Sequence, residues 1–136
     1  MKEIKYRAWD KEQKTMWTVS SLYPLEKTAD VFRFEINRQT GKEERISNFR
    51  FDYPEHLVLM QFTSLKDKNG KKIYKEDIVN LESPFLGDMK GETIQGDSGE
   101  WLIHKSSGNY VSVYHNRDKI EVIGNIYENP KLLEKK

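Results

Sequence analysis

The chain has 136 residues, of which 36% are hydrophobic, 12% aromatic and 33% charged, and its formal net charge is only +1. This length supports one domain or two small subdomains that share a core. The absence of cysteine excludes disulfides, zinc ribbons and thiol catalysis. Because the sequence contains no apolar signal segment and no run of eighteen apolar residues, we expect a soluble cytoplasmic protein without membrane contact.

The aromatic residues lie mostly in short alternating runs, which predicts a mainly β protein. Residues 4–9 and 15–19 alternate in polarity on either side of a polar segment, so we expect a first β-hairpin with a loop of about five residues. Trp9 and Trp17 belong to these two strands. We expect them to lie in the core and to meet as a cross-strand aromatic pair.

A second hairpin is predicted over residues 31–36 and 43–51, because two alternating runs flank a turn that contains glycine. One face of this hairpin should be polar.

The segment that precedes it, residues 20–30, has no clean period. Pro24 interrupts both helix and strand there, so we expect a loop.

Residues 57–63 form the strongest apolar run and are too few for a stable helix, which predicts a strand. Apolar side chains fall on both of its faces, so the strand should be central in its sheet. A turn follows, because the side chains of Asp67 and Asn69 can bond to nearby backbone amides and Gly70 accepts a positive φ.

Five further short strands, separated by turns at nearly regular spacing, are expected at residues 78–81, 92–95, 100–104, 110–114 and 120–127. This pattern suits a small closed barrel, because closure removes exposed edges. We therefore predict an SH3-like barrel over residues 72–127. The expected organisation is an N-terminal β-hairpin region (1–65), the SH3-like β-barrel (66–130) and a short tail (131–136), all in one compact unit.

Charge is unevenly distributed along the second half of the chain. Residues 66–75 carry five lysines against one aspartate, or +4, whereas residues 76–103 carry one lysine against seven acids, or −6. These blocks can bind different partners or bind each other. Backbone phosphates favour lysines interleaved with an aromatic ring, so the candidate nucleic-acid-binding residues are Lys66, Lys68, Lys71, Lys72, Tyr74 and Lys75.

Little in the sequence indicates catalysis. The three histidines, at positions 56, 104 and 115, are scattered, so we expect no metal site. Phosphate-binding loops and the nucleophile-elbow motif are absent. A hydrolase that uses two carboxylates remains an alternative, since two acids need only meet in space, but no pair is singled out. We therefore expect a protein that is not an enzyme and has no cofactor.

Three segments together, residues 4–10 (IKYRAWD), 59–79 and 120–130 (IEVIGNIYENP), resemble the YopX family of bacteriophage and prophage proteins. The resemblance implies a mainly β fold with an SH3-type barrel. It implies no established activity, so no catalytic residue is carried over. Ser64 and Glu76 stand where the family pattern leads us to expect glycine. If those glycines have positive φ, each substitution costs about 1 kcal/mol or shifts the turn.

Two functions from different classes follow. We favour a protein-interaction or assembly module, whose partner is a host protein, a phage protein or a second copy of the chain, because small barrels commonly act as adaptors. The alternative is a nucleic-acid-binding module that uses the basic turn at Lys66–Lys75. The near-neutral net charge argues against this alternative.

Overall fold

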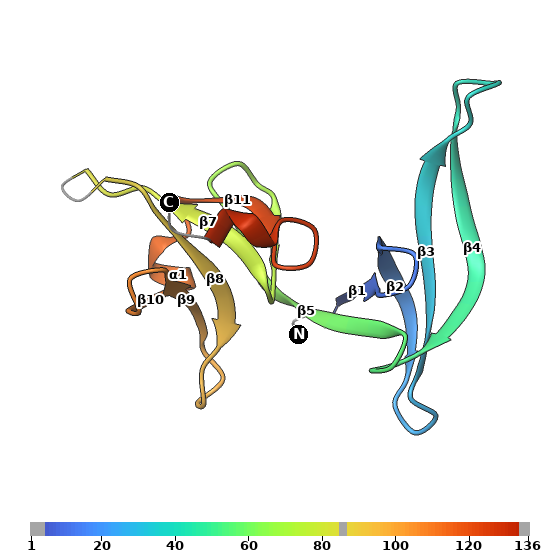
Figure 1. Ribbon diagram of the computed structural model, residues 1–136, viewed down its shortest axis with the longest axis horizontal. Coiled ribbons are helices and arrows are strands. Elements are labelled where there is room, and N and C mark those ends of the chain that lie inside the picture. Colours follow the sequence, from blue (N-terminus) through green and yellow to red (C-terminus); the bar gives the residue numbers. More distant parts are fainter. Residues whose placement is uncertain (1–4, 85–86, 134–136) are drawn as a thin grey trace. The chain divides into compact units, whose positions relative to one another are not determined.

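The computed structural model describes residues 5–84 and 87–133, and this part of the chain is mainly β, as predicted (Figure 1). The elements in chain order are β1 (Tyr6–Asp10), β2 (Thr15–Tyr23), β3 (Thr28–Ile36), β4 (Glu43–Asp52), β5 (Leu57–Lys66), β6 (Lys72–Tyr74), β7 (Asp77–Leu81), β8 (Met89–Gln95), β9 (Trp101–Lys105), β10 (Tyr110–Ser112), α1 (Val113–Asn116), β11 (Ile120–Asn125) and the 3-10 helix η1 (Pro130–Leu133). Among the described residues, no helix has the length and apolar character needed to cross a membrane.

The described chain forms two compact units, residues 5–60 and residues 61–133. The division falls within β5, between Met60 and Gln61. Each unit has its own buried apolar cluster. The first cluster consists of Ala8, Trp17, Ala29, Val31 and Leu57, and the second consists of Ile73, Val79, Leu81, Ile103, Val113, Ile120 and Val122.

Strand β5 is central in its sheet, which confirms the prediction from its apolar run. The sheet order is β4-β3-β2-β1-β5-β6, so β5 has a strand on either side. Leu57 and Met60 are fully buried. After the division, the same strand continues into the second unit, where Phe62 pairs with Tyr74 and Lys66 pairs with Lys72.

The first hairpin forms as predicted, but its two tryptophans do not pair. Strands β1 and β2 are antiparallel, with Ala8 opposite Trp17 and Trp9 opposite Met16. Because successive side chains of a strand point to opposite faces, this register places Trp9 and Trp17 on opposite faces of the sheet. Both are buried, so the expected core role is confirmed while the cross-strand pair is wrong.

The prediction of a loop at residues 20–30 is also wrong. Strand β2 continues to Tyr23 and β3 begins at Thr28. The register between them shifts between Val19 and Ser21. This irregularity inserts one residue and reverses the alternation of polarity, which hides the strand period in the sequence. Pro24 lies in the short turn between the strands, where it removes no ladder hydrogen bond.

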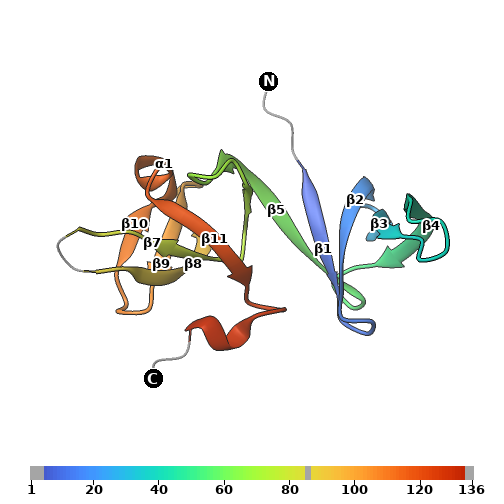
Figure 2. The ribbon, with the colours of Figure 1, turned by 90° about the horizontal axis from the view of Figure 1, so that it is seen from above.

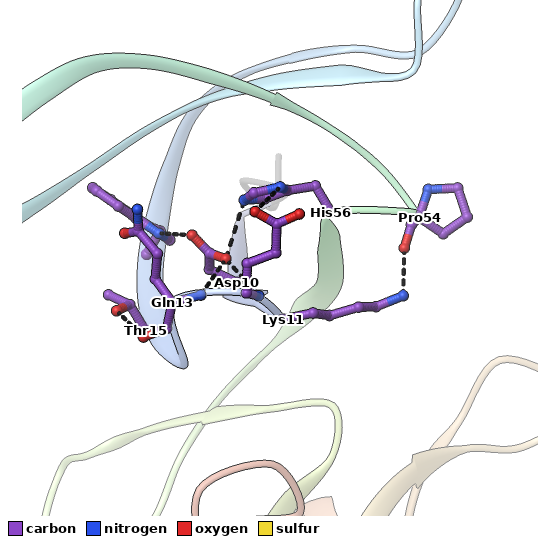
Figure 3. Close-up of polar contacts among 8 residues, drawn as sticks. Asp10, Lys11, Gln13, Thr15, Pro54 and His56 are labelled. Carbon is purple, nitrogen blue, oxygen red and sulfur yellow. Dashed lines mark hydrogen bonds and ion pairs between the residues drawn. The ribbon is translucent and has the colours of Figure 1, made fainter.

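A buried carboxylate organises the first unit (Figure 3). Asp10 is completely buried. Its Oδ1 accepts hydrogen bonds from the backbone N–H groups of Glu12 and Gln13, both at 3.0 Å, and lies 3.0 Å from His56 Nε2. Its Oδ2 accepts from the indole N–H of Trp17 at 3.3 Å. Burial raises the pKa of Asp10, but these donors together hold that pKa below its ordinary value.

The second unit contains a five-stranded antiparallel sheet in the order β10-β9-β8-β7-β11 (Figure 2). These strands correspond to the five segments that the sequence predicts, except that residues 113 and 114 of the fourth segment begin α1, which connects β10 to β11. Within the described residues the hydrogen-bonded sheet is open, with β10 and β11 at its edges. The closed SH3-like barrel is therefore not confirmed.

The last strand is shorter than predicted. β11 ends at Asn125, whose side-chain oxygen accepts hydrogen bonds from the backbone N–H groups of Tyr127 and Glu128 and so starts a turn. Pro130 then begins η1. Residues 134–136 of the predicted tail, like residue 4 of the predicted first strand, lie outside the described residues.

Ser64 and Glu76 both adopt the left-handed conformation, with φ of 69° and 71°. The resemblance leads us to expect glycine at these two positions, and the structure shows why glycine suits them. The strain of each substitution is of the order of 1 kcal/mol. At the second position there is a compensating contact, because the Glu76 carboxylate accepts a hydrogen bond from the Tyr127 hydroxyl.

Asp67 anchors the turn after β5 and is nearly buried. Its Oδ1 accepts hydrogen bonds from the backbone N–H groups of Asn69 and Lys71, both at 2.9 Å, and Gly70 has the predicted positive φ. Its Oδ2 accepts from the backbone N–H of Val122 on β11, also at 2.9 Å. Burial raises the pKa of Asp67, but these three amides and the charge of Lys71 hold it below the ordinary value of 3.8.

Asp67→Asn is expected to lower the free energy of unfolding by about 2–3 kcal/mol at pH 7, because the amide offers one acceptor oxygen and turns a donor toward a backbone N–H. Since the pKa of folded Asp67 lies below that of the unfolded chain, its stabilisation is complete above pH 3.8 and is lost as the pH falls through the folded value. The difference between parent and variant should therefore shrink in acid. Urea unfolding followed by circular dichroism at pH 7 and in acid measures both effects.

Asp97→Asn is the matched control, because Asp97 is exposed in the turn between β8 and β9. It should change the unfolding free energy by less than about 0.5 kcal/mol. Equal effects of the two substitutions would contradict the anchoring role of Asp67.

Candidate functional site

The six residues predicted to bind nucleic acid do not form one surface. Lys66 and Lys72 lie opposite each other on β5 and β6. The Lys72 ammonium lies 5.6 Å from the centre of the Phe62 ring, and the Tyr74 ring contacts the same phenyl group at 5.4 Å between centroids. This face of the β5–β6 ribbon therefore combines two lysines with two aromatic rings. Lys71 and Lys75 are exposed in the turns on either side of β6.

Lys68, unlike the other four lysines of the predicted site, forms an ion pair within the described chain. Its ammonium binds the Glu82 carboxylate and lies 4.0 Å from that of Glu121. The hydrogen bond to Glu82 raises the pKa of Lys68. One residue of the acidic segment 76–103, Glu82, thus neutralises one lysine of the basic turn. Lys68 is therefore less available to bind a phosphate than the other lysines.

The histidines lie in separate environments. His56 stacks on Phe51 with 4.2 Å between ring centroids, beside Asp10. His104 stacks on Tyr110 at 4.6 Å, and the backbone N–H of His115 donates to the Ser112 hydroxyl at the start of α1. In the part of the chain that the structure describes, no group of three or more His, Cys, Asp or Glu residues is placed to hold a metal ion.

The structure brings one pair of glutamates together that the sequence did not single out. Burial raises the pKa of Glu92, and the negative charge of Glu76 raises it further, while His104 and Lys75 act in the opposite direction. Glu76 accepts a hydrogen bond from Tyr127, whose pKa is raised by burial and by this bond. The pair thus consists of a carboxyl whose pKa is raised and a carboxylate that accepts a hydrogen bond from Tyr127.

A groove of about 470 Å³ lies in the second unit. Its lining combines aromatic residues from β5 (Phe62), β9 (Trp101) and α1 (Tyr114) with several polar residues, and neither glutamate of the pair above belongs to it. Glu100 is the only charged residue among its described lining. The Ser98 hydroxyl donates a hydrogen bond to this carboxylate and lowers its pKa, so Glu100 is ionised at neutral pH.

The first unit presents a different surface, which we name the β3–β4 arm (residues 33–46). Strand β2 pairs with β3 only from Thr28 to Phe32, whereas β4 pairs with β3 as far as Ile36. The two strands therefore continue past the end of β2 as a ribbon (Figure 1). Phe34 and Ile36, which are 55% and 63% exposed, follow Phe32 on one face of this ribbon.

Arginine side chains accompany the aromatic residues of this face. The Arg45 guanidinium lies 4.0 Å from the centre of the Phe32 ring, and Phe32 and Phe34 meet edge to face at 5.8 Å. Farther along the strands, Arg50 forms an ion pair with Asp30. The apolar stripe formed by Phe32, Phe34 and Ile36 is thus ordered by contacts with Phe32 at the base of the arm and remains exposed at its outer end.

Sequence reasoning missed both the groove and the arm. The groove combines residues from positions 62, 101 and 114, whose spacing in the chain carries no signal. The arm was visible in part, since the alternation of residues 31–36 was recognised as a strand with one polar face. The alternation does not show that β2 stops pairing with β3 at Phe32, nor that Phe34 and Ile36 stay exposed on one face of the ribbon.

Comparisons with known proteins agree with this architecture. The family model described as "YopX protein" matches residues 5–134. A solved structure, described as the crystal structure of protein EF1440 from Enterococcus faecalis, is similar with a TM-score of 0.69 and 29% sequence identity, over 98% of this chain and 100% of that chain. No curated protein matches the sequence.

Proposed function

The chain belongs to the YopX family, and we propose that it is a non-enzymatic protein-interaction or assembly module. The observation that supports this role best is the β3–β4 arm with its exposed apolar stripe. In keeping with the resemblance to phage and prophage proteins, we place this role in the cytoplasm of a bacterial host.

The arm has the physical properties of a contact surface. A two-stranded ribbon is marginally stable in water unless another surface packs against it. Burying the exposed parts of Phe34 and Ile36 contributes about 1 kcal/mol each to a complex. Strand β4 also lies at the edge of its sheet. Among the described residues its outer backbone groups face no further strand and can pair with a strand of a partner.

The polar groups that the structure buries support a structural rather than a catalytic use. Asp10 and Asp67 direct both of their oxygens at N–H groups of the chain. Asp77 accepts a hydrogen bond from the backbone N–H of Tyr74. These carboxylates stabilise turns, and a carboxylate that serves a turn is poorly placed to accept a proton from a substrate.

Photo-crosslinking tests the arm directly. Phe34→p-benzoylphenylalanine keeps an aromatic ring at an exposed position and should give a discrete cross-linked product, either with a second copy of the purified chain or with a host protein in cells. Leu25→p-benzoylphenylalanine is the matched control, because Leu25 is fully exposed in the turn between β2 and β3. Products are resolved by electrophoresis and identified by mass spectrometry.

The product from position 34 should disappear when Ile36→Asn is added, because this change makes the neighbouring part of the stripe polar. A product that forms equally from positions 25 and 34, or none from position 34, would show that the arm is not a contact surface.

A second candidate function is nucleic-acid binding, and it is supported by the face of the β5–β6 ribbon that carries Lys66, Lys72, Phe62 and Tyr74. Lysines beside partly exposed rings suit a single strand, whose phosphates need cations and whose bases stack on aromatic side chains.

If this candidate is right, labelled oligothymidine should bind with an affinity that falls steeply with salt. Joint Lys66→Ala and Lys72→Ala substitution should reduce the slope of log K against log salt by about 1.4, the loss of two contacts to a single strand. Lys68→Ala should change it little, because Lys68 already pairs with Glu82. Fluorescence anisotropy at several salt concentrations measures the slope. Absence of binding at low salt, or the same slope in all variants, would refute nucleic-acid binding at this face.

A further inference from the structure

A hollow of about 420 Å³ lies in the first unit, where two of its strands are irregular. Strand β4 has one residue more than β3 at this point, so that Ser47 and Asn48 together lie opposite Phe32. Strand β2 has an extra residue of its own, Ser20. Ser20, Ser47 and Asn48 all line the hollow, and Asn48 adopts the left-handed conformation with φ of 71°. The hollow therefore lies where both strand ladders are interrupted.

The register places two arginines on one face of the sheet at this hollow. Arg50 lies opposite Asp30, and Arg45 lies opposite Phe34. Because alternate residues of a strand share a face, Asp30, Phe32 and Phe34 point the same way, and both arginines point with them. The two arginines and Asp30 are the charged residues of the described lining, so its net charge is positive. An anion is therefore the ligand that the charges favour.

Each of the two guanidinium groups is held over an aromatic ring. The guanidinium carbon of Arg45 lies 4.0 Å from the centre of the Phe32 ring, and that of Arg50 lies 4.3 Å from the centre of the Tyr23 ring. A guanidinium that lies over a ring keeps its N–H donors at its edge, where they can still bind an anion. Because both side chains are already ordered, less conformational entropy is lost when a ligand binds.

The donors of the two arginines are used differently. Arg50 binds Asp30 through two hydrogen bonds, from Nε at 2.7 Å and from Nη2 at 3.1 Å. Arg45, in contrast, has no ion-pair partner within the described chain. The side chains of Ser47 and Asn48 likewise have no hydrogen-bond partner among the described residues. The lining thus combines one uncompensated cation with a hydroxyl and an amide that are free to donate.

We propose that this hollow binds the phosphate group of a small phosphate monoester. At neutral pH such a group carries a charge of about −1.5 to −2 and three acceptor oxygens. It can accept two parallel hydrogen bonds from Arg45 and one each from Ser47 and Asn48, whereas the two oxygens of a carboxylate are already satisfied by Arg45 alone. The hollow is larger than a phosphate ion and has the size of a small-ligand site, which leaves room for the ester group.

This inference does not depend on a partner of the β3–β4 arm. Cross-linking at the exposed stripe tests the arm, and phosphate binding tests the hollow at its base. Either proposal can fail while the other stands.

The test is an NMR titration of the ¹⁵N-labelled full-length protein with phenyl phosphate at low salt. Binding should shift the backbone N–H signals of Ser47 and Asn48 and the Nε–H signal of Arg45. Inorganic phosphate should shift the same signals but bind more weakly, because it leaves the rest of the hollow unfilled. Benzoate has the same ring with a single carboxylate, and it should bind at least about tenfold more weakly than phenyl phosphate.

Matched variants of the protein locate the site. Arg45→Gln should weaken the binding of phenyl phosphate at least about tenfold, as expected for loss of a charge-assisted contact. Arg38→Gln removes the same charge from the turn between β3 and β4, outside the lining, and should leave binding unchanged. Asp30→Asn should strengthen binding by about threefold or more, because it removes a negative charge from the hollow and releases Arg50. Preserved backbone spectra show that each variant is folded.

The proposal is supported if phenyl phosphate binds more tightly than benzoate and inorganic phosphate, and if Arg45→Gln alone of the two arginine variants weakens it. It is overturned if phenyl phosphate shifts none of these signals at millimolar concentration, if either control ion binds as tightly, or if Asp30→Asn weakens binding. An oligothymidine without a terminal phosphate that shifts the same signals would also overturn it, because the phosphates of that chain are diesters.

Discussion

A carboxylate that is removed from water requires N–H donors, and two buried aspartates meet this requirement in ways that fix the turns of both units. Asp10 receives two backbone amides and the indole of Trp17, and it lies beside His56 at the start of β5. Asp67 receives three backbone amides, one of them from Val122, 55 residues farther along the chain. Each carboxylate therefore holds its own turn and also joins distant parts of the chain. The apolar clusters supply the larger share of the burial, but they do not specify where these turns are placed.

The candidate surfaces are the parts that this framework leaves uncovered. The β3–β4 arm exists because β2 stops pairing with β3 at Phe32, and the groove lies where residues of β5, β9 and α1 surround one hollow without filling it. Sequence reasoning found the lysines, because they are contiguous, but it could not tell that Lys68 is paired with Glu82. It missed the groove because the ring of Tyr114 is more than fifty residues from that of Phe62. Contacts across such separations depend on sheet order, which local periodicity does not encode.

The fold itself was predictable wherever a strand alternates regularly or is apolar on both faces, and wherever a turn carries its own chemistry. The central strand β5 and the turn at Asp67 are examples. Prediction failed where one inserted residue reverses the alternation, as around Ser20 in β2. It also failed where the register decides the face, as for Trp9 and Trp17. The left-handed conformation of Ser64 could not be read from its own residue type and was indicated only by the family resemblance.

The most direct test of this account is the titration of the carboxyl carbons of Asp10 and Asp67 by NMR. Burial alone raises the pKa of a carboxyl group, whereas N–H donors aimed at the carboxylate lower it. Both groups should titrate below the ordinary value of 3.8, and the backbone N–H signal of Val122 should shift with the same midpoint as Asp67. A pKa at or above the ordinary value would mean that burial outweighs the donors, and would contradict the claim that an ionised aspartate fixes the turn within each unit.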